Sequence, residues 1–250
     1  MACETESRQR NESAEFIRLP AVHKKHISCL CRRTELEGFG RQGKQTPENL
    51  LEWIDDCAET NFKLANTAIS QHLSSKIQTA TKIITYAWCP VVNKVLLDTV
   101  AGDHDGKDIC ILDTFKNGPG IRHLFSLSDY DGYVEYGDLS AVGCVFQRAS
   151  LVLLGCSAVL SSGRVLVPRG SVQIALVAKA HCVPVLVLAP TYKFVDKAQA
   201  SSRMALLGRS SLLELLPADL ISAIVTDIRL LPPSSAPAVL RAKALDDTTA

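Results

Sequence analysis

The chain lacks any long apolar run. No stretch of 18 consecutive apolar residues occurs, so the sequence offers no candidate for a membrane-spanning helix. The first residues, M-A-C-E-T-E-S, are polar and have none of the apolar core that a secretory signal needs. We therefore expect a soluble protein of the cytosol.

Paired cysteine motifs are also missing. The nine cysteines are an odd number without a C-x-x-C pair, which argues against both a disulfide framework and a typical zinc motif. Several lie inside apolar segments and are read as reduced thiols that fill the core, namely Cys110, Cys144, Cys156 and Cys182. A reducing compartment is expected, with no metal and no cofactor.

The charge balance has no excess of either sign. Basic residues number 27 and acidic residues 26, which gives a net charge of +1. No overall field favours nucleic acid, an anionic membrane or an acidic substrate, and none of these is expected as a partner. A hydrophobic content of 47% over 250 residues is enough for one large domain with a smaller appendage.

Residues 1–45 are predicted to be a mostly disordered or short helical amino region, because they are charged and lack a sustained period. His23, His26, Cys29 and Cys31 suggest a metal site at first sight. On a helix, however, Cys29 and Cys31 point to different sides, so a basic amphipathic helix is the favoured interpretation.

Gly38 to Gly43 spell G-x-G-x-x-G, the pattern of a dinucleotide-binding turn. That turn needs a strand before it and a helix immediately after it, so that the helix start faces the pyrophosphate. Neither condition is met here, and the segment is predicted to be a flexible linker.

Thr46, Pro47 and Glu48 form a strong helix start, with a hydroxyl cap, a proline at the first helical position and an acid in the first turn. Apolar residues then keep helical spacing to Ile77, with one irregular step around Asn61 and Phe62. Residues 46–78 are predicted to be a long connecting helix of about 45 Å.

Residues 79–250 are predicted to be a Rossmann-like α/β domain with a doubly wound parallel sheet, because strands and helices alternate from Thr81 onward. The expected strands are 82–88, 108–113, 133–136, 151–154, 185–188 and 221–226. The expected helices are 91–100, 120–127, 139–147, 195–207, one opened by Gly170 and Ser171, and one from Pro237.

The candidate site lies before the central helix. A turn that ends at Gly163 leads to Arg164, and Arg169 stands beside the helix start at Gly170 and Ser171. Backbone N–H groups at a helix start favour anions. The loop could hold a phosphate, or a carboxylate at a subunit interface, while a capped helix with solvated arginines remains the structural alternative.

Leucines crowd between Leu212 and Ile221 and return around Pro232, Pro233 and Pro237. Proline-interrupted segments cannot all lie in a sheet, so part of this apolar surface is expected to face outward. Self-association through the carboxyl domain is the resulting prediction.

Two stretches carry a resemblance to a known family. The stretch from L-V-L-L-G-C-S to A-L-V-A-K-A-H-C-V-P-V-L-V and T-Y-K-F, followed by V-T-D-I-R-L-L-P-P-S-S-A-P-A-V-L-R, resembles the regulatory subunits of eukaryotic translation initiation factor 2B, most of all the delta type. The resemblance covers roughly residues 50–242. It implies a Rossmann-like carboxyl domain behind a helical region.

The resemblance also implies a function. Such a subunit would belong to the complex that exchanges GDP for GTP on translation initiation factor 2 and that is inhibited when this substrate is phosphorylated. Its partners would be the beta-type and catalytic subunits of factor 2B. Pro168 and the pair Ile228-Arg229 depart from the delta pattern, which leaves a delta orthologue and a divergent paralogue both open.

The superfamily of the subunits that this chain resembles also contains sugar-phosphate isomerases, such as methylthioribose-1-phosphate isomerase. An enzyme of this kind is the alternative function. They carry a catalytic cysteine where this chain has Ala87, and an aspartate in a G-A-D turn where it has Ser157. Cys89 lies two residues beyond Ala87, so it could replace the catalytic cysteine only if the strand were shifted in register. Serine cannot supply the carboxylate of a proton transfer, so a non-catalytic subunit is expected, with no catalytic residue.

Overall fold

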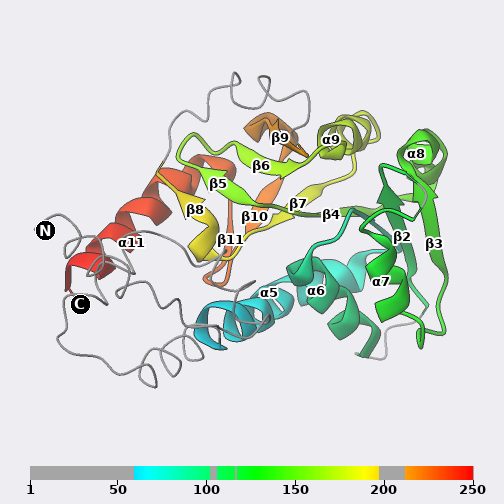
Figure 1. Cartoon of the computed structure of the whole chain (residues 1–250), viewed down its shortest axis with the longest axis horizontal. Coiled ribbons are helices and arrows are strands. Elements are labelled where there is room, and N and C mark those ends of the chain that lie inside the picture. Colours follow the sequence, from blue (N-terminus) through cyan, green and yellow to red (C-terminus); the bar gives the residue numbers. More distant parts are fainter. Residues whose placement is uncertain (1–58, 102–105, 116, 197–211, 250) are drawn as a thin grey trace, which may run out of the picture. The chain divides into compact units, whose positions relative to one another are not determined.

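The computed structural model describes residues 59–101, 106–115, 117–196 and 212–249. Apart from Glu59, these belong to one compact unit, Thr60–Ala250 (Figure 1). The helix suggested around the histidines and cysteines at 23–31, the glycine pattern at 38–43 and the helix start at Thr46 lie outside the described residues.

Seven strands form the main sheet in the order β11-β10-β7-β4-β1-β2-β3. All neighbours are parallel except β10 and β11, which run antiparallel. The predicted doubly wound parallel sheet is therefore confirmed. Its strands are β1 (Lys82–Tyr86), β2 (Asp108–Asp113), β3 (Val134–Asp138), β4 (Leu151–Gly155), β7 (Val185–Leu188), β10 (Ala223–Val225) and β11 (Leu230–Leu231).

A second sheet of four strands, in the order β8-β5-β6-β9, was not predicted. Its strands are β5 (Ala158–Leu160), β6 (Val165–Pro168), β8 (Phe194–Val195) and β9 (Leu213–Leu216). The predicted turn at 161–163 joins β5 to β6, so the segment between β4 and the central helix is a hairpin rather than a loop. β6 buries every second residue, as a strand with one covered face does.

Helices cover both faces of the main sheet (Figure 1). α5 (Ala65–Thr79), α6 (Pro90–Ala101) and the short α7 (Ile121–Ser126) pack on one face. α8 (Val142–Val145), α9 (Ser171–Ala180) and the second sheet pack on the other, where α11 (Ala236–Thr249) also begins. Across the described ranges, no helix has the length and apolarity needed to cross a membrane.

The strands of the main sheet send alternate side chains into two separate cores. In β1, Ile83 faces the core beneath α5 and α6, whereas Ile84 and Tyr86 face the core beneath α9. All five residues of β1 are buried, as expected for a central parallel strand covered by helices on both faces.

The long helix changes its winding where the sequence predicted an irregular step. Glu59–Leu64 form a π-helical turn, labelled η1, and regular α-helix follows from Ala65. Ile69, Leu73 and Ile77 then fall on the buried face at spacings of four.

Two predicted helices differ from the structure. The segment predicted as one helix over 139–147 is three short pieces, η2 (Leu139–Ala141), α8 and η3 (Phe146–Arg148). In the helix predicted over 195–207, Val195 belongs to β8, and 197–207 lie outside the described residues.

The leucine-rich segment is divided between the core and the surface, with five half-buried members, Leu213, Leu215, Leu230, Val239 and Leu240. Leu216, Leu220, Ile221 and Leu231 are buried, and only Leu212 is largely exposed, at 85%. Pro217 and Pro232 fall between short strands and the turns η5 (Ala218–Leu220) and η6 (Pro233–Ser235), whereas Pro233 lies within η6 and Pro237 within α11.

Candidate functional site

The order of strands reverses at β1, which lies between β2 and β4. In an open parallel sheet, ligands bind beyond the carboxyl ends of the strands at such a switch point. Two loops continue the chain from these ends, Ala87–Cys89 after β1 and Cys156–Ser157 after β4. They form the centre of the candidate site.

The first loop begins with a strained residue. Ala87 has a φ of 53°, a left-handed conformation that alanine rarely adopts. Its N–H donates to the carbonyl of Leu112 at 3.0 Å, and its carbonyl lies 3.1 Å from Nε2 of His123. The turn thus keeps its shape through hydrogen bonds to β2 and α7.

His123 is fully buried and serves this turn. Burial lowers its pKa from 6.5 to about 4, so the imidazole is neutral near pH 7. Nδ1 lies 3.0 Å from Oδ1 of Asn93, and Nε2 lies 3.1 Å from the carbonyl of Ala87 and 3.4 Å from the backbone nitrogen of Cys89. A neutral ring carries one N–H, so one ring nitrogen donates and the other accepts. Both ring nitrogens are occupied, and His123 has a structural role.

Cys89 is packed against β4. A Cβ atom at Gly155 would lie 2.3 Å from both Cβ and Sγ of Cys89, so only glycine fits there. The Cys89 side chain is 7% exposed and belongs to the core beneath α6. Cys156 belongs to the core on the other face, and burial raises the pKa of its thiol to about 11. Both thiols fill space between elements.

A buried carboxylate lies at the carboxyl end of β2, and the sequence did not single it out. Asp113 at the end of β2 is fully buried. It accepts hydrogen bonds from the N–H of Gly120 at 2.5 Å and from the hydroxyl of Tyr136 at 3.1 Å. These bonds fix the turn that begins α7, so this carboxylate is engaged in structure.

The start of α9 already holds a carboxylate. Gly170 has a φ of 106° and precedes the first helical residue, Ser171. Oε1 of Glu214, on β9, accepts from the N–H of Gly170 at 2.8 Å and from the N–H of Val172 at 2.7 Å. The backbone N–H groups of the helix start are thus occupied by a carboxylate of the chain itself, as in the structural alternative of a capped helix.

Tyr86 connects this helix start to the switch point. Its hydroxyl donates to the carbonyl of Arg169 and lies 2.6 Å from the hydroxyl of Thr114, from which it can accept. A Cβ atom at Gly170 would lie 2.2 Å from the same hydroxyl, so glycine is needed for the close approach. Burial raises the pKa of Tyr86 and keeps the phenol protonated.

The five predicted site residues fall into two groups. Arg169, Gly170 and Ser171 stand together at the start of α9, whereas Gly163 and Arg164 lie at the tip of the β5–β6 hairpin. The extended strand β6 separates the groups by roughly 13 Å, at ~3.3 Å per residue. Both arginines are exposed, and neither forms an ion pair with another described residue.

The T-Y-K-F motif fastens the carboxyl edge of the main sheet. Thr191 donates to the Asp227 carboxylate through its N–H at 2.6 Å and through its hydroxyl at 2.9 Å. Nζ of Lys193 donates to the carbonyl of Cys156 at 2.7 Å. The Tyr192 ring packs edge-on against Phe62 of the π turn, with centroids 5.0 Å apart. The motif therefore joins the ends of β4 and β10 to the turn that precedes α5.

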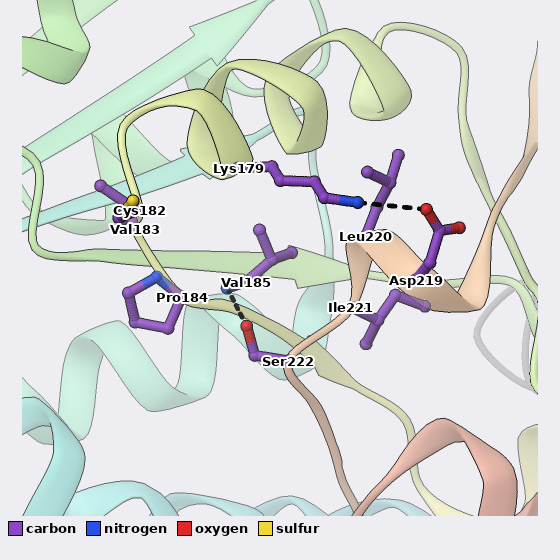
Figure 2. A pocket seen from close by; sticks show the side chains of 9 residues that line it. All are labelled: Lys179, Cys182, Val183, Pro184, Val185, Asp219, Leu220, Ile221 and Ser222. Carbon is purple, nitrogen blue, oxygen red and sulfur yellow. Dashed lines mark hydrogen bonds and ion pairs between the residues drawn. The ribbon is translucent and has the colours of Figure 1, made fainter.

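A pocket of about 350 Å³ lies at the opposite edge, where β7 begins (Figure 2). Figure 2 shows the Lys179 ammonium and the Asp219 carboxylate facing each other across its rim, 3.2 Å apart. The hydroxyl of Ser222 accepts from the N–H of Val185 at 3.0 Å. These polar groups of the rim are thus paired with one another. The exposed Cys182 thiol lies beside the pocket, just after the end of α9.

No group of three or more His, Cys, Asp or Glu side chains that could hold a metal ion occurs within the described ranges. The described residues at the switch point include two buried thiols, a neutral imidazole, a carboxylate bonded to the α7 turn and an exposed hydroxyl at Ser157. The imidazole and the carboxylate help to hold the adjoining loops in place.

The family model described as "Initiation factor 2 subunit family" matches residues 27–211, well over half of the chain. The delta subunit of translation initiation factor eIF2B from Dictyostelium discoideum is 29% identical over 223 residues, covering 77% of the chain and 36% of that protein. The chain spans about a third of the delta-type relatives it matches, since the Schizosaccharomyces pombe subunit is covered to 33%.

An enzyme is also similar. Ribose 1,5-bisphosphate isomerase of Methanocaldococcus jannaschii is 26% identical over 221 residues, covering 80% of the chain and 70% of the enzyme. Among solved structures, eIF2B delta from Chaetomium thermophilum has a TM-score of 0.63 at 24% identity over 82% of this chain and 72% of that one. A chain of the tetrameric eIF2B-beta2-delta2 complex from C. thermophilum has a TM-score of 0.66 at 23% identity, covering 81% and 69%. At these identities the structural matches establish a shared fold.

Proposed function

The chain belongs to the initiation factor 2 subunit family, and from that membership we propose that it is a regulatory, non-catalytic subunit of the complex that exchanges GDP for GTP on translation initiation factor 2. The likeness to delta subunits, at 29% identity over 77% of the chain, is the observation that carries the proposal. Its proposed partners are beta-type and catalytic subunits, with initiation factor 2 as their substrate, in the cytosol.

The geometry at the switch point supports a role without chemistry. Cys89 is buried under Gly155, His123 is neutral and bonded on both nitrogens, and Asp113 is engaged with the α7 turn. A proton-transfer enzyme needs an acid or base within reach of its substrate. The groups present here hold the two loops in shape instead.

A subunit of this kind acts by binding. Its contribution is to favour one conformation of the assembly by binding the phosphorylated and unphosphorylated forms of the substrate factor with different affinity. A tenfold difference in affinity between the two forms corresponds to about 1.4 kcal/mol, which a few contacts can supply. The subunit needs only a surface that distinguishes the two forms.

The candidate loop of Gly163, Arg164, Arg169, Gly170 and Ser171 is proposed as a contact surface within the assembly. Glu214 already satisfies the backbone N–H groups of Gly170 and Val172. The exposed guanidinium groups of Arg164 and Arg169 are therefore the parts of the loop that can meet a carboxylate or phosphate of a neighbouring subunit.

Affinity purification of the tagged chain from its source cell, followed by mass spectrometry, tests the proposal. Recovery together with the other factor 2B subunits supports it. A tagged Rossmann-fold protein of similar abundance serves as the control for unspecific capture. If the chain is recovered alone, the assignment to an exchange-factor complex is wrong.

The isomerase relative supplies a second candidate, a sugar-phosphate aldose-ketose isomerase. Cys89 is the thiol that stands closest in sequence to the catalytic position occupied here by Ala87. We expect no turnover of ribose-1,5-bisphosphate or methylthioribose-1-phosphate by the purified chain. Turnover that disappears in Cys89→Ser would overturn the non-catalytic assignment.

Self-association is proposed on the strength of the family resemblance, because only part of the leucine-rich segment reaches the surface and Leu212 is its one largely exposed leucine among the described residues. Light scattering on the isolated chain should give a dimer or larger species, and co-expression with a beta-type subunit should replace it by a mixed assembly. A monomer that persists over a wide concentration range would count against a place in a large complex.

A further inference from the structure

The two edges of the main sheet differ. One edge is β11, which has two residues and is followed directly by Pro232 and Pro233. The other edge is β3, a strand of five residues without proline, which lies at the right-hand border of the sheet in Figure 1. Short strands and prolines protect a sheet edge from pairing with another chain, whereas a longer strand without them leaves the edge open.

The outer side of β3 carries backbone groups that can pair. The parallel register sets Ile109 of β2 opposite Val134, and the N–H of Ile109 donates to the carbonyl of Tyr133 at 2.9 Å. In this pattern alternate residues of β3 turn their backbone groups away from β2. The N–H and C=O groups of Val134 and Tyr136 therefore point outward, as does the N–H of Asp138, and within the described residues no hydrogen bond reaches them.

The charges of β3 select one register for a second copy of the strand. Glu135 and Asp138 are its acidic residues. In an antiparallel pair whose twofold axis passes Tyr136, Glu135 faces Gly137 of the second copy, and Asp138 faces Val134. An axis at Glu135 or at Asp138 would instead set two identical acids opposite each other, which destabilises the pair. The axis at Tyr136 also pairs every residue of the strand.

This register forms hydrogen bonds and covers an exposed ring. The N–H of each Tyr136 meets the carbonyl of the other Tyr136, and the N–H of each Asp138 meets the carbonyl of Val134 in the other copy. Tyr133, which is 62% exposed, comes to lie opposite Leu139 of the second copy. Pairing therefore replaces hydrogen bonds to water by hydrogen bonds within a sheet, and it buries aromatic surface.

We propose that β3 pairs with β3 of a second copy of this chain, so that two main sheets join into one continuous sheet about a twofold axis at Tyr136. The pairing rests on the self-association proposed above and specifies its surface. A contact between two strand edges is smaller than a standard interface, so the dimer should be reversible and should depend on concentration.

Sedimentation equilibrium of the full chain over a wide concentration range measures this contact. Wild type should give a reversible equilibrium between monomer and dimer. Val134→Pro should weaken the dimer at least about tenfold, because the proline ring replaces an outward N–H and pushes against the second strand. The melting temperature of this variant should change little, since the lost N–H takes no part in the pairing with β2.

Substitutions at Gly137 test the register. A Cβ atom there would lie 3.6 Å from the Leu112 side chain and 4.0 Å from that of Ala141, so both lysine and glutamate can be introduced. Gly137→Lys sets a positive charge opposite Glu135 of the second copy, and Gly137→Glu sets a negative one. The lysine variant should form the tighter dimer, by about tenfold. The same two substitutions at Gly143, where a Cβ atom meets nothing within 4 Å, are the control and should give equal dimers.

The outcomes separate this contact from self-association in general. A dimer that survives in folded Val134→Pro, or equal dimers of the two Gly137 variants, refutes the pairing through β3 and leaves self-association in place. If Val134→Pro does not fold, the Gly137 variants decide alone. A dimer that is lost in Leu212→Asp instead assigns the interface to that exposed leucine and also refutes the pairing. If wild type is a monomer throughout, both the pairing and the self-association are wrong.

Discussion

Replacing Glu214 by alanine should destabilise the fold by removing the carboxylate that caps α9. The variant leaves the N–H groups of Gly170 and Val172 without their present acceptor. Gly170 is buried and Val172 is half-buried, so water can replace the carboxylate only in part. The cost therefore exceeds that of losing an exposed cap.

The magnitude follows from the two hydrogen bonds. A hydrogen bond to a charged group contributes about 1.5–3 kcal/mol when it is well buried. Because Glu214 is itself half-buried, we take about 1 kcal/mol for each bond, which is also the typical value of a helix cap. The expected loss is ~2 kcal/mol, equivalent to a fall of about 4–8 °C in the melting temperature of a domain of this size.

Urea unfolding followed by circular dichroism measures this loss as a change in the midpoint at constant slope. Glu214→Gln keeps one acceptor oxygen but loses the charge, so it should fall between wild type and Glu214→Ala. Asp219→Ala is the matched control, since this acid has an exposed ion pair with Lys179 and should cost no more than about 0.5 kcal/mol.

If Glu214→Ala costs no more than Asp219→Ala, the carboxylate does not stabilise the helix start. A second outcome would be equally damaging. If phosphate raised the melting temperature of wild type but not that of Arg169→Glu, an external anion would be displacing Glu214 from the two N–H groups.

Cys182 has a φ of 57° at the end of α9, so Cys182→Gly should stabilise the fold by about 0.5–1 kcal/mol in urea, whereas Cys144→Gly within α8 should destabilise it. The pKa of His123 is lowered to about 4 by burial, so its contribution to stability is complete above pH 6.5 and is lost as the pH falls toward 4, by up to about 3 kcal/mol. His123→Gln should flatten the difference between unfolding free energies at pH 7 and pH 4.5, and equal slopes in both proteins would contradict the assignment. Arg169→Glu should weaken subunit assembly and leave the melting temperature nearly unchanged, since an exposed arginine contributes on the order of 0–1 kcal/mol to stability. The control is Arg241→Glu, at an exposed arginine on α11. If both variants assemble equally well, the loop has a structural role only.

The main sheet was predictable because its central strands are short runs of branched apolar residues bounded by turn residues such as Gly155 and Pro184. Asp108–Asp113 was predicted with its observed bounds. The β5–β6 hairpin was missed, since strands of three and four residues carry too few alternations to separate them from a loop. The resemblance to factor 2B subunits, read from the sequence, is confirmed by the family match.

The site was less predictable, because its partners are distant in sequence. The helix start at Gly170 follows from local residues, but its anion comes from Glu214, one acid in a leucine-rich strand. The sequence signal that could have indicated this cap is a single acidic residue within an otherwise apolar strand. The π turn was anticipated as a break in period around Phe62, while its contact with Tyr192 depends on the tertiary fold.

The contact between Cys89 and Gly155 has a consequence for how this sequence can change over time. A side chain at either position excludes one at the other, because a Cβ at Gly155 would fall 2.3 Å from the Cβ of Cys89 itself. For the side chain to move from residue 89 to residue 155, residue 89 must first become glycine. A side chain introduced at residue 155 before that change would clash with the Cβ of Cys89. The end of β4 and the loop after β1 therefore limit each other's substitutions although they are far apart along the chain, and the thiol at residue 89 fills the volume that glycine at residue 155 leaves free.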